Sequence, residues 1–133
     1  MKVMELTGAW LDYWVAIARG TDVVVKANSG DDVFMYGEAS CWVNINSLLN
    51  NPRRWRPTRD WGIAGSIIER EGMEVSPLAQ LRTFRPGEMS WRARYAHAEP
   101  SHTALGCTPL EAAMRAFVHR WYGDEVPDRE MGR

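Results

Sequence analysis

The clearest hydrophobic pattern in the chain lies in residues 108–123. Thr108 and Glu111 form the Thr-x-x-Glu pattern of a capping box, which satisfies free N–H groups at the start of a helix. Pro109 suits the first helical position, and Gly123 suits the residue that ends a helix. The apolar residues between them recur with helical spacing: Leu110, Ala113, Met114, Phe117, Val118 and Trp121. We therefore predict a helix with one buried face.

A second helical pattern covers residues 6–20, with Thr7 placed to cap the helix and Gly20 placed to end it. Its apolar stripe consists of Leu11, Trp14, Val15 and Ala18, widened by Trp10 and Ile17. The residues expected on the outward face are Asp12, Tyr13 and Arg19. This pattern predicts a helix that is buried on more than one side.

A third helix is predicted over residues 60–72, although this segment contains two glycines. Asp60 can cap the helix and Gly72 can end it. Gly62 and Gly65 each lower helix stability by about 1 kcal/mol relative to alanine. Glycines inside a helix indicate close packing or the close approach of a ligand.

The first predicted strands lie between the first and third helices. Residues 22–27 are rich in β-branched side chains, which favour a strand. A turn at 28–31 can return the chain through a partner strand at 33–36. Residues 41–45 alternate between apolar and polar positions and are expected to form another short strand.

Two further strands are predicted after the third helix. Residues 73–76 begin the first of them, and residues 91–97 form the second. Alternation in the later strand places Trp91, Ala93, Tyr95 and His97 on one face and Arg92 and Arg94 on the other. Residues 99–106 are expected to form a loop that leads to the last helix.

The order of these elements predicts an α+β fold. A small, mostly antiparallel sheet is expected to pack with about three helices in an α/β sandwich-like arrangement. We expect residues 1–126 to form a single globular domain and residues 127–133 to form a polar, flexible C-terminal tail.

The bulk composition is that of an ordinary globular protein, with 133 residues, 45% hydrophobic and 25% charged. A net charge of −1 argues against a dedicated nucleic-acid or membrane binder. The chain contains no apolar run of the roughly 20 residues that a membrane span needs and no signal-peptide pattern. We therefore expect a cytoplasmic protein in which Cys41 and Cys107 are free thiols.

Sequence motifs of common enzymes are missing from the chain. It has no phosphate loop, no dinucleotide-binding glycine pattern, no Gly-x-Ser-x-Gly and no His-Glu-x-x-His. His97, His102 and His119 lack ligand-like spacing, and neither a zinc site with Cys107 nor a Cys107–His102 nucleophile has support. The sequence therefore assigns no catalytic residue, no metal ligand and no cofactor.

Tryptophan and arginine dominate the candidate ligand-binding residues. The chain has seven tryptophans, more than one core normally requires, so some are expected to line a cleft or an interface. Residues 50–59 form a loop with arginines around Trp55. The predicted ligand-binding residues are Tyr13, Trp55, Thr58, Asp60, Trp61, Arg70, Trp91 and Arg115. Aromatic rings with guanidinium groups suit a flat anionic ligand such as a nucleotide.

A structural alternative accounts for several of the same residues. Trp61 and Trp91 can lie in the core, and Glu111 and Arg115 can form an exposed ion pair along one helix.

Three stretches of the chain resemble the phage NinX-like family, small proteins of bacteriophages and prophages. Residues 5–16, Glu-Leu-Thr-Gly-Ala-Trp-Leu-Asp-Tyr-Trp-Val-Ala, are similar to the family's opening, and residues 57–61 with 67–71 are similar to its Pro-x-x-Asp-Trp…Ile-Glu-Arg pattern. The third stretch is 108–116, followed by 123–128. The resemblance implies a phage accessory protein of the bacterial cytoplasm with an α/β sandwich-like fold. It carries over no catalytic residue.

These observations leave three functional hypotheses. The first is a non-enzymatic phage protein that binds a nucleotide-like small molecule, as in anti-defence sequestration, or a host protein. The second is a nucleic-acid-binding factor that uses the arginines of residues 53–59. The third is an enzyme of unknown class that uses Glu69 or His97. A homodimer is a further alternative, because aromatic residues are enriched in interfaces as well as in pockets.

Overall fold

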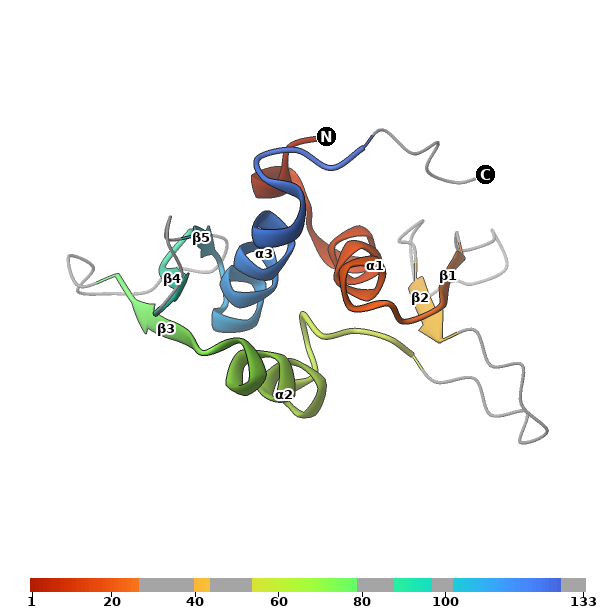
Figure 1. Cartoon of the computed structure of the whole chain (residues 1–133), viewed down its shortest axis with the longest axis horizontal. Helices are drawn as coiled ribbons and strands as arrows, with labels where there is room; N and C mark the ends of the chain where they lie inside the picture. The colour runs from red at the N-terminus through yellow and green to blue at the C-terminus, as the bar shows by residue number, and fades with distance from the viewer. Residues whose placement is uncertain (27–39, 44–53, 79–87, 97–101, 128–133) are drawn as a thin grey trace.

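Helix α3 lies at the centre of the protein, between a three-stranded sheet and the other helices (Figure 1). The computed structural model describes residues 1–26, 40–43, 54–78, 88–96 and 102–127. In chain order the elements are η1 (Val3–Glu5), α1 (Gly8–Arg19), β1 (Val23–Lys26), β2 (Ser40–Val43), α2 (Trp61–Glu71), β3 (Met73–Pro77), β4 (Trp91–Tyr95), β5 (Thr103–Gly106) and α3 (Pro109–Tyr122). The predicted α+β class is therefore confirmed, with two small antiparallel sheets in place of one.

Helix α3 begins as its capping pattern predicts, since the Thr108 hydroxyl accepts a hydrogen bond from the Glu111 N–H at 3.0 Å. Its burial is wider than one face, because every residue from Ala112 to Val118 is buried. Trp121, the last member of the predicted stripe, is instead 58% exposed. That part of the prediction is wrong because α1, α2 and the end of α3 leave a cleft at this position.

Helix α1 ends at Gly20, which adopts the left-handed conformation with a φ of 83°. Leu11, Trp14 and Val15 are buried as predicted. Asp12 was expected on the outward face but is only 3% exposed. The expectation is wrong because a segment remote in sequence covers this side of α1: the Trp55 indole N–H donates to the Asp12 carbonyl at 2.8 Å.

Helix α2 begins at a working cap, since the Asp60 carboxylate accepts hydrogen bonds from the N–H groups of Gly62 at 2.8 Å and Ile63 at 3.4 Å. It ends at Gly72, which is left-handed with a φ of 65°. A Cβ atom at Gly65 would have no neighbour within 4 Å. Close packing therefore does not account for the Gly65 position.

The larger sheet has the strand order β3-β4-β5 and is antiparallel throughout. Ala93 of β4 pairs with Val75 of β3 and Ala104 of β5. The face that carries Ala93 and Tyr95 is buried, and the arginines predicted on the other face, Arg92 and Arg94, are exposed. The alternation predicted for residues 91–95 is thus confirmed, whereas His97 lies outside the described residues.

Strand β5 corrects the prediction of a loop over residues 99–106. Its sequence, Thr-Ala-Leu-Gly, has little intrinsic preference for a strand, so pairing with β4 and packing against α3 stabilise it. In the smaller sheet β1 pairs with β2 (Val24 with Trp42). The return strand predicted at 33–36 lies outside the described residues.

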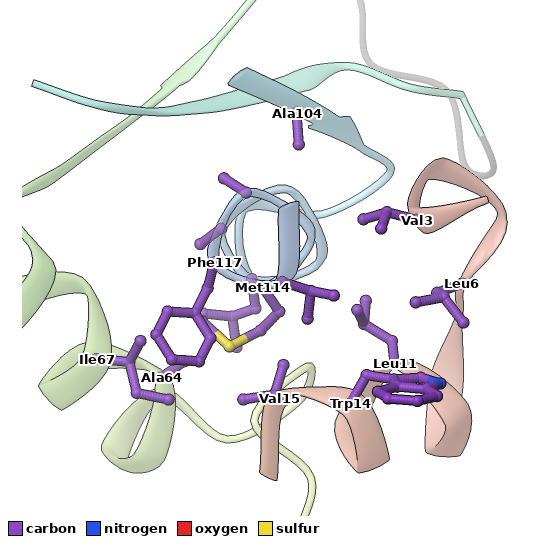
Figure 2. Close-up of a cluster of buried hydrophobic side chains, with 14 of the residues drawn as sticks. Val3, Leu6, Leu11, Trp14, Val15, Ala64, Ile67, Ala104, Met114 and Phe117 are labelled. Atoms are coloured by element: carbon purple, nitrogen blue, oxygen red, sulfur yellow. The ribbon is translucent and has the colours of Figure 1, made fainter. Parts of the chain in front are cut away.

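The core joins the three helices to the larger sheet. Figure 2 shows Met114 and Phe117 of α3 beside Val15 of α1 and Ile67 of α2, with Ala104 of β5 on the opposite side of α3. The two ends of the described chain also meet, because the Val3 N–H donates to the Asp124 carbonyl at 2.9 Å. Within the described ranges, no helix has both the length and the apolar character needed to cross a membrane.

Candidate ligand-binding clefts

A cleft of about 250 Å³ opens between α1, α2 and α3, and we name it the three-helix cleft. Its lining residues are Ala18, Arg19, Ser66, Ile67, Arg70, Glu71, Phe117 and Trp121. Helical spacing explains the set, because Ser66 and Arg70 lie one turn apart on α2 and Phe117 and Trp121 lie one turn apart on α3.

The three-helix cleft combines an apolar floor with a cationic and aromatic rim. Ile67 and Phe117 are buried and belong to the core. Arg19, Arg70 and Trp121 are exposed. An exposed indole offers a flat surface for stacking, and guanidinium groups bind phosphate or carboxylate oxygens. This side of the protein can therefore accept a ligand with a flat apolar part and an anionic part.

Glu71 contributes a fixed carboxylate to the same cleft. The Tyr95 hydroxyl donates to Glu71 Oε1 at 3.1 Å, and Arg120 Nε lies 4.0 Å from the same oxygen. Burial of Tyr95, together with the charge and hydrogen bond of Glu71, raises the pKa of the Tyr95 hydroxyl, which stays protonated and keeps donating. Glu71 is therefore oriented by the fold.

A second cleft, smaller and more polar, surrounds Asp12, and we name it the Asp12 cleft. Its volume is about 50 Å³, enough for a few water molecules or one tetrahedral oxyanion. Its lining residues are Gly8, Ala9, Asp12, Ser40, Cys41, Arg54, Trp55, Arg56, Thr58 and Arg59. The start of α1, strand β2 and the segment before α2 thus meet here, including residues of the first two stretches that carry the family resemblance.

The Asp12 carboxylate is held in this cleft by Thr58, whose backbone N–H donates to Asp12 Oδ1 at 2.9 Å. Burial raises the pKa of Asp12 from 3.8 to about 6, against the lowering effect of hydrogen bonds from Thr58 and of the charges on Arg59 and Arg54. Burial and the charge of Asp12 also raise the pKa of the Cys41 thiol to about 12, so this thiol stays neutral. Buried carboxylates with a raised pKa are concentrated at functional sites.

Trp55 connects the two clefts. Its indole is buried, lines the Asp12 cleft and donates to the Asp12 carbonyl at 2.8 Å. The guanidinium carbon of Arg19, which lines the three-helix cleft, lies 5.8 Å from the centre of the Trp55 ring. Trp55 therefore supports Arg19 of the three-helix cleft and forms part of the wall of the Asp12 cleft.

Replacing Asp12 with asparagine is expected to stabilise the protein near neutral pH. The side-chain oxygen of the asparagine can still accept the Thr58 N–H, and the buried charge is gone. The pKa of Asp12 is about 6 in the folded state rather than 3.8. Between these two pH values the folded protein therefore binds more protons than the unfolded chain, and wild-type stability falls as pH rises. The gain should reach up to about 3 kcal/mol near neutral pH and vanish below about pH 4.

Urea denaturation of both proteins across this pH range measures the difference. A variant that is less stable than the wild type by the same amount at every pH would contradict the prediction. That result would assign the effect to side-chain packing rather than to the buried charge.

The residues predicted to bind a ligand do not converge on one pocket. Trp55 and Thr58 line the Asp12 cleft, and Arg70 lines the three-helix cleft. Asp60 caps α2. Trp61 lines neither of these clefts and is 59% exposed, so the alternative that it lies in the core is wrong.

Tyr13 and Trp91 line neither of the two clefts. Tyr13 is half-buried and makes edge-to-face contacts with Trp10 and Trp14, at ring-centre distances of 5.9 and 5.3 Å. Trp91 is half-buried at the start of β4 and packs against the core. These two aromatic residues contribute to packing.

Arg115 is 1% exposed, although the sequence places it on the polar side of α3. The predicted ion pair with Glu111 is present, at 3.0 Å from Arg115 Nη1 to Glu111 Oε1, but it is not the exposed pair expected from the sequence. The guanidinium also donates to the carbonyls of Leu6 at 3.0 Å and Leu105 at 2.9 Å. Arg115 thus joins three segments of the fold.

The predicted ligand-binding set did not include several residues that line the clefts, among them Asp12, Arg19, Ser66, Glu71 and Trp121. Sequence reasoning also missed a chain of polar contacts in which His102 Nδ1 lies 2.8 Å from His119 Nδ1, and His119 Nε2 lies 2.9 Å from Asp124 Oδ1. No signal in the sequence joins these residues, because each contact depends on how the elements pack. In the described part of the chain, no three His, Cys, Asp or Glu side chains gather into a metal-binding group.

Comparison with known proteins gives a family match. The family model described as "Bacteriophage P22, NinX" matches residues 2–120 of the chain. No curated protein matches the chain. The match covers every lining residue of the two clefts except Trp121, which lies just beyond its end.

Proposed function

The chain belongs to the bacteriophage P22 NinX family, and from this premise we propose that it is a phage accessory protein that binds a nucleotide-like small molecule in the three-helix cleft. The observation that carries the proposal is the exposed indole of Trp121 beside the exposed guanidinium groups of Arg19 and Arg70. A nucleobase can stack on the indole while the phosphate oxygens accept hydrogen bonds from the two arginines.

The size of the cleft favours a single nucleotide over a larger ligand. Pockets for drug-sized molecules enclose roughly 300–1,000 Å³, and the three-helix cleft has about 250 Å³. A mononucleotide would therefore be only partly enclosed, with its base over Trp121 and part of its surface in solvent. Ser66, whose hydroxyl donates to the Ile63 carbonyl at 2.8 Å, offers its oxygen lone pairs to a ribose hydroxyl or a base donor.

Binding without catalysis fits the chemistry of these side chains. The guanidinium groups of Arg19 and Arg70 donate hydrogen bonds and accept none, so they can hold an anion but cannot act as bases. Glu71 already accepts the Tyr95 hydroxyl. Retention of a host nucleotide requires a cleft of this kind and no catalytic group. We propose that the protein sequesters such a nucleotide in the cytoplasm of the infected bacterium.

Replacing Trp121 with alanine is expected to weaken nucleotide binding strongly. Stacking of a base on an aromatic side chain contributes about 1–3 kcal/mol, which corresponds to a loss of roughly 5- to 150-fold in affinity. A panel of nucleotides is first screened by thermal shift, because a ligand of the folded state raises Tm. Titration calorimetry then gives the affinity of each variant for the nucleotide that produces the largest shift.

Trp61→Ala is the matched control, because Trp61 and Trp121 are 59% and 58% exposed and each lies near the end of a helix. The proposal expects Trp61→Ala to bind like the wild type. Loss of binding in Trp61→Ala alone would favour the pocket predicted from the sequence instead. A panel in which no nucleotide raises Tm would contradict nucleotide binding and leave a host protein as the better partner.

A further inference from the structure

The Asp12 cleft places a carboxylate among arginines, and this combination is the starting point for a second site. Arg54, Arg56 and Arg59 are exposed and line the cleft. None of the three takes part in the ion pairs formed among the described residues. The guanidinium carbon of Arg54 lies 5.6 Å from the centre of the Trp42 ring. The positive charges of the three arginines can attract an anion to the cleft that they line.

The carboxylate of Asp12 retains hydrogen-bonding capacity on the cleft side. A carboxylate can accept about four hydrogen bonds. Thr58 supplies one through its backbone N–H, at 2.9 Å. Asp12 also lines the open volume of about 50 Å³ beside Arg59. A donor that enters this volume can reach the remaining lone pairs.

An anion fits such a cleft only if it carries a proton of its own. Arginines attract any oxyanion, but an ionised carboxylate repels one that has only lone pairs to offer. Sulfate has no proton at neutral pH. Inorganic phosphate keeps at least one P–OH group, which can donate to a carboxylate while the other oxygens accept from guanidinium groups.

We propose that the Asp12 cleft binds a protonated phosphate group, and that Asp12 is the residue that selects phosphate over sulfate. The ligand class is inorganic phosphate or the terminal phosphate of a small phosphomonoester. This site is distinct from the three-helix cleft and does not depend on nucleotide binding there. The discrimination follows from one hydrogen bond that phosphate can donate and sulfate cannot.

The titratable groups around Asp12 support this assignment. Cys41, from β2, remains neutral because burial raises the pKa of its thiol. Arg54, Arg56 and Arg59, on the segment before α2, contribute positive charge to the same cleft. Asp12 is therefore the group that changes charge between about pH 5 and 7, since its pKa lies near 6. Below that range Asp12 is protonated and can donate to either anion.

Titration calorimetry with sodium phosphate and sodium sulfate near pH 7.5 tests the proposal on the full-length protein. The wild type is expected to bind phosphate at least about 10-fold more tightly than sulfate, the size of effect that one hydrogen bond to a charged group provides. The preference should shrink at about pH 5, where Asp12 is protonated. Equal affinities for both anions near pH 7.5, or no binding of phosphate at millimolar concentrations, would overturn the proposal.

Asp12→Asn is the decisive variant, because asparagine keeps the acceptor for the Thr58 N–H and has an NH₂ group that donates to either anion. It is expected to bind sulfate and phosphate within about 3-fold of each other. Arg59→Ala should weaken the binding of both anions. An Asp12→Asn protein that still prefers phosphate would overturn the role of Asp12, and its Tm shows whether it is folded.

The pH dependence of binding distinguishes inorganic phosphate from a phosphomonoester as the ligand. Near pH 7.5 a phosphomonoester such as a nucleoside monophosphate has lost its last proton, since the second pKa is near 6, whereas inorganic phosphate has not. Preference for inorganic phosphate at this pH, with monoester binding that appears only at about pH 5.5, supports the proposal. Tighter binding of an oligonucleotide than of phosphate, with steep salt dependence, would overturn it in favour of a nucleic-acid surface. Trp121→Ala should leave phosphate binding unchanged, which separates this test from that of the three-helix cleft.

Discussion

Replacing Arg115 with alanine is expected to lower the free energy of unfolding by about 3–5 kcal/mol, the cost of breaking a buried charged network. The substitution removes the donors to the carbonyls of Leu6 and Leu105 and the partner of Glu111. The Arg115 side chain is 2% exposed, so water cannot readily replace these hydrogen bonds. Equilibrium urea denaturation monitored by tryptophan fluorescence measures the loss.

Arg120→Ala is the matched control, because Arg120 is on the same helix but has a partly exposed side chain. Its contacts are a 4.0 Å ion pair with Glu71 and a guanidinium carbon 4.7 Å from the centre of the Tyr95 ring. It should cost less than about 1 kcal/mol. If Arg115→Ala does not fold, Arg115→Lys retains the charge but not the forked geometry and should still lose stability. A loss below about 1 kcal/mol in Arg115→Ala would show that the network does not stabilise the fold.

Replacing Gly106 with alanine is expected to destabilise the protein by about 3 kcal/mol or more, at the upper end of the cost of overpacking. A Cβ atom at Gly106 would lie 2.4 Å from the backbone nitrogen of Ala112 and 2.9 Å from its Cα. Both atoms belong to the backbone of α3 rather than to a flexible side chain. Strand β5 and helix α3 would have to move apart, and thermal or urea denaturation would record the loss.

Gly65→Ala is the same chemical change as Gly106→Ala, but it is expected to have the opposite effect on stability. A Cβ atom at Gly65 would have no neighbour within 4 Å, and alanine favours a helix interior by about 1 kcal/mol over glycine. This variant is therefore expected to be more stable than the wild type. Destabilisation by Gly65→Ala, or tolerance of Gly106→Ala, would contradict the packing described for α2 and α3.

The sequence predicted the three helices because each has local signals at both ends, although Thr7 at the start of α1 makes no side-chain cap hydrogen bond. Thr108 and Asp60 form side-chain caps, and Gly20 and Gly72 are left-handed terminators. Strand β5 has no such signals. Its pairing with β4 and its contact with α3 through Gly106 arise only in the folded chain.

The candidate site was less predictable than the fold. Composition indicates that tryptophan and arginine should line a cleft, and the structure contains a cleft lined by Trp121, Arg19 and Arg70. Periodicity, however, assigned Trp121 to the buried stripe of α3 and Asp12 to the outward face of α1, and both assignments are wrong. Each error has the same physical cause: packing by segments remote in sequence, which covers Asp12 and leaves a cleft beneath Trp121.

The third stretch of the family resemblance shows why a shared motif need not mark a ligand site. It includes Arg115, whose contacts are to the carbonyls of Leu6 and Leu105 and to Glu111. By contrast, the first two stretches meet at the Asp12 cleft, where Asp12 lies beside Thr58 and Arg59. The second stretch also reaches the three-helix cleft through Ile67, Arg70 and Glu71. The motif residues therefore divide among the core and both candidate sites.

The most direct test of the three-helix cleft is a nucleotide titration followed by ¹⁵N–¹H NMR of the indole N–H signals. The seven tryptophans give separate signals, each assigned by its phenylalanine variant. Binding in the three-helix cleft predicts that the Trp121 signal shifts most, that Trp55, which lies against Arg19, shifts less, and that Trp61 does not move. A titration in which Trp61 shifts while Trp121 stays unchanged would contradict the proposal.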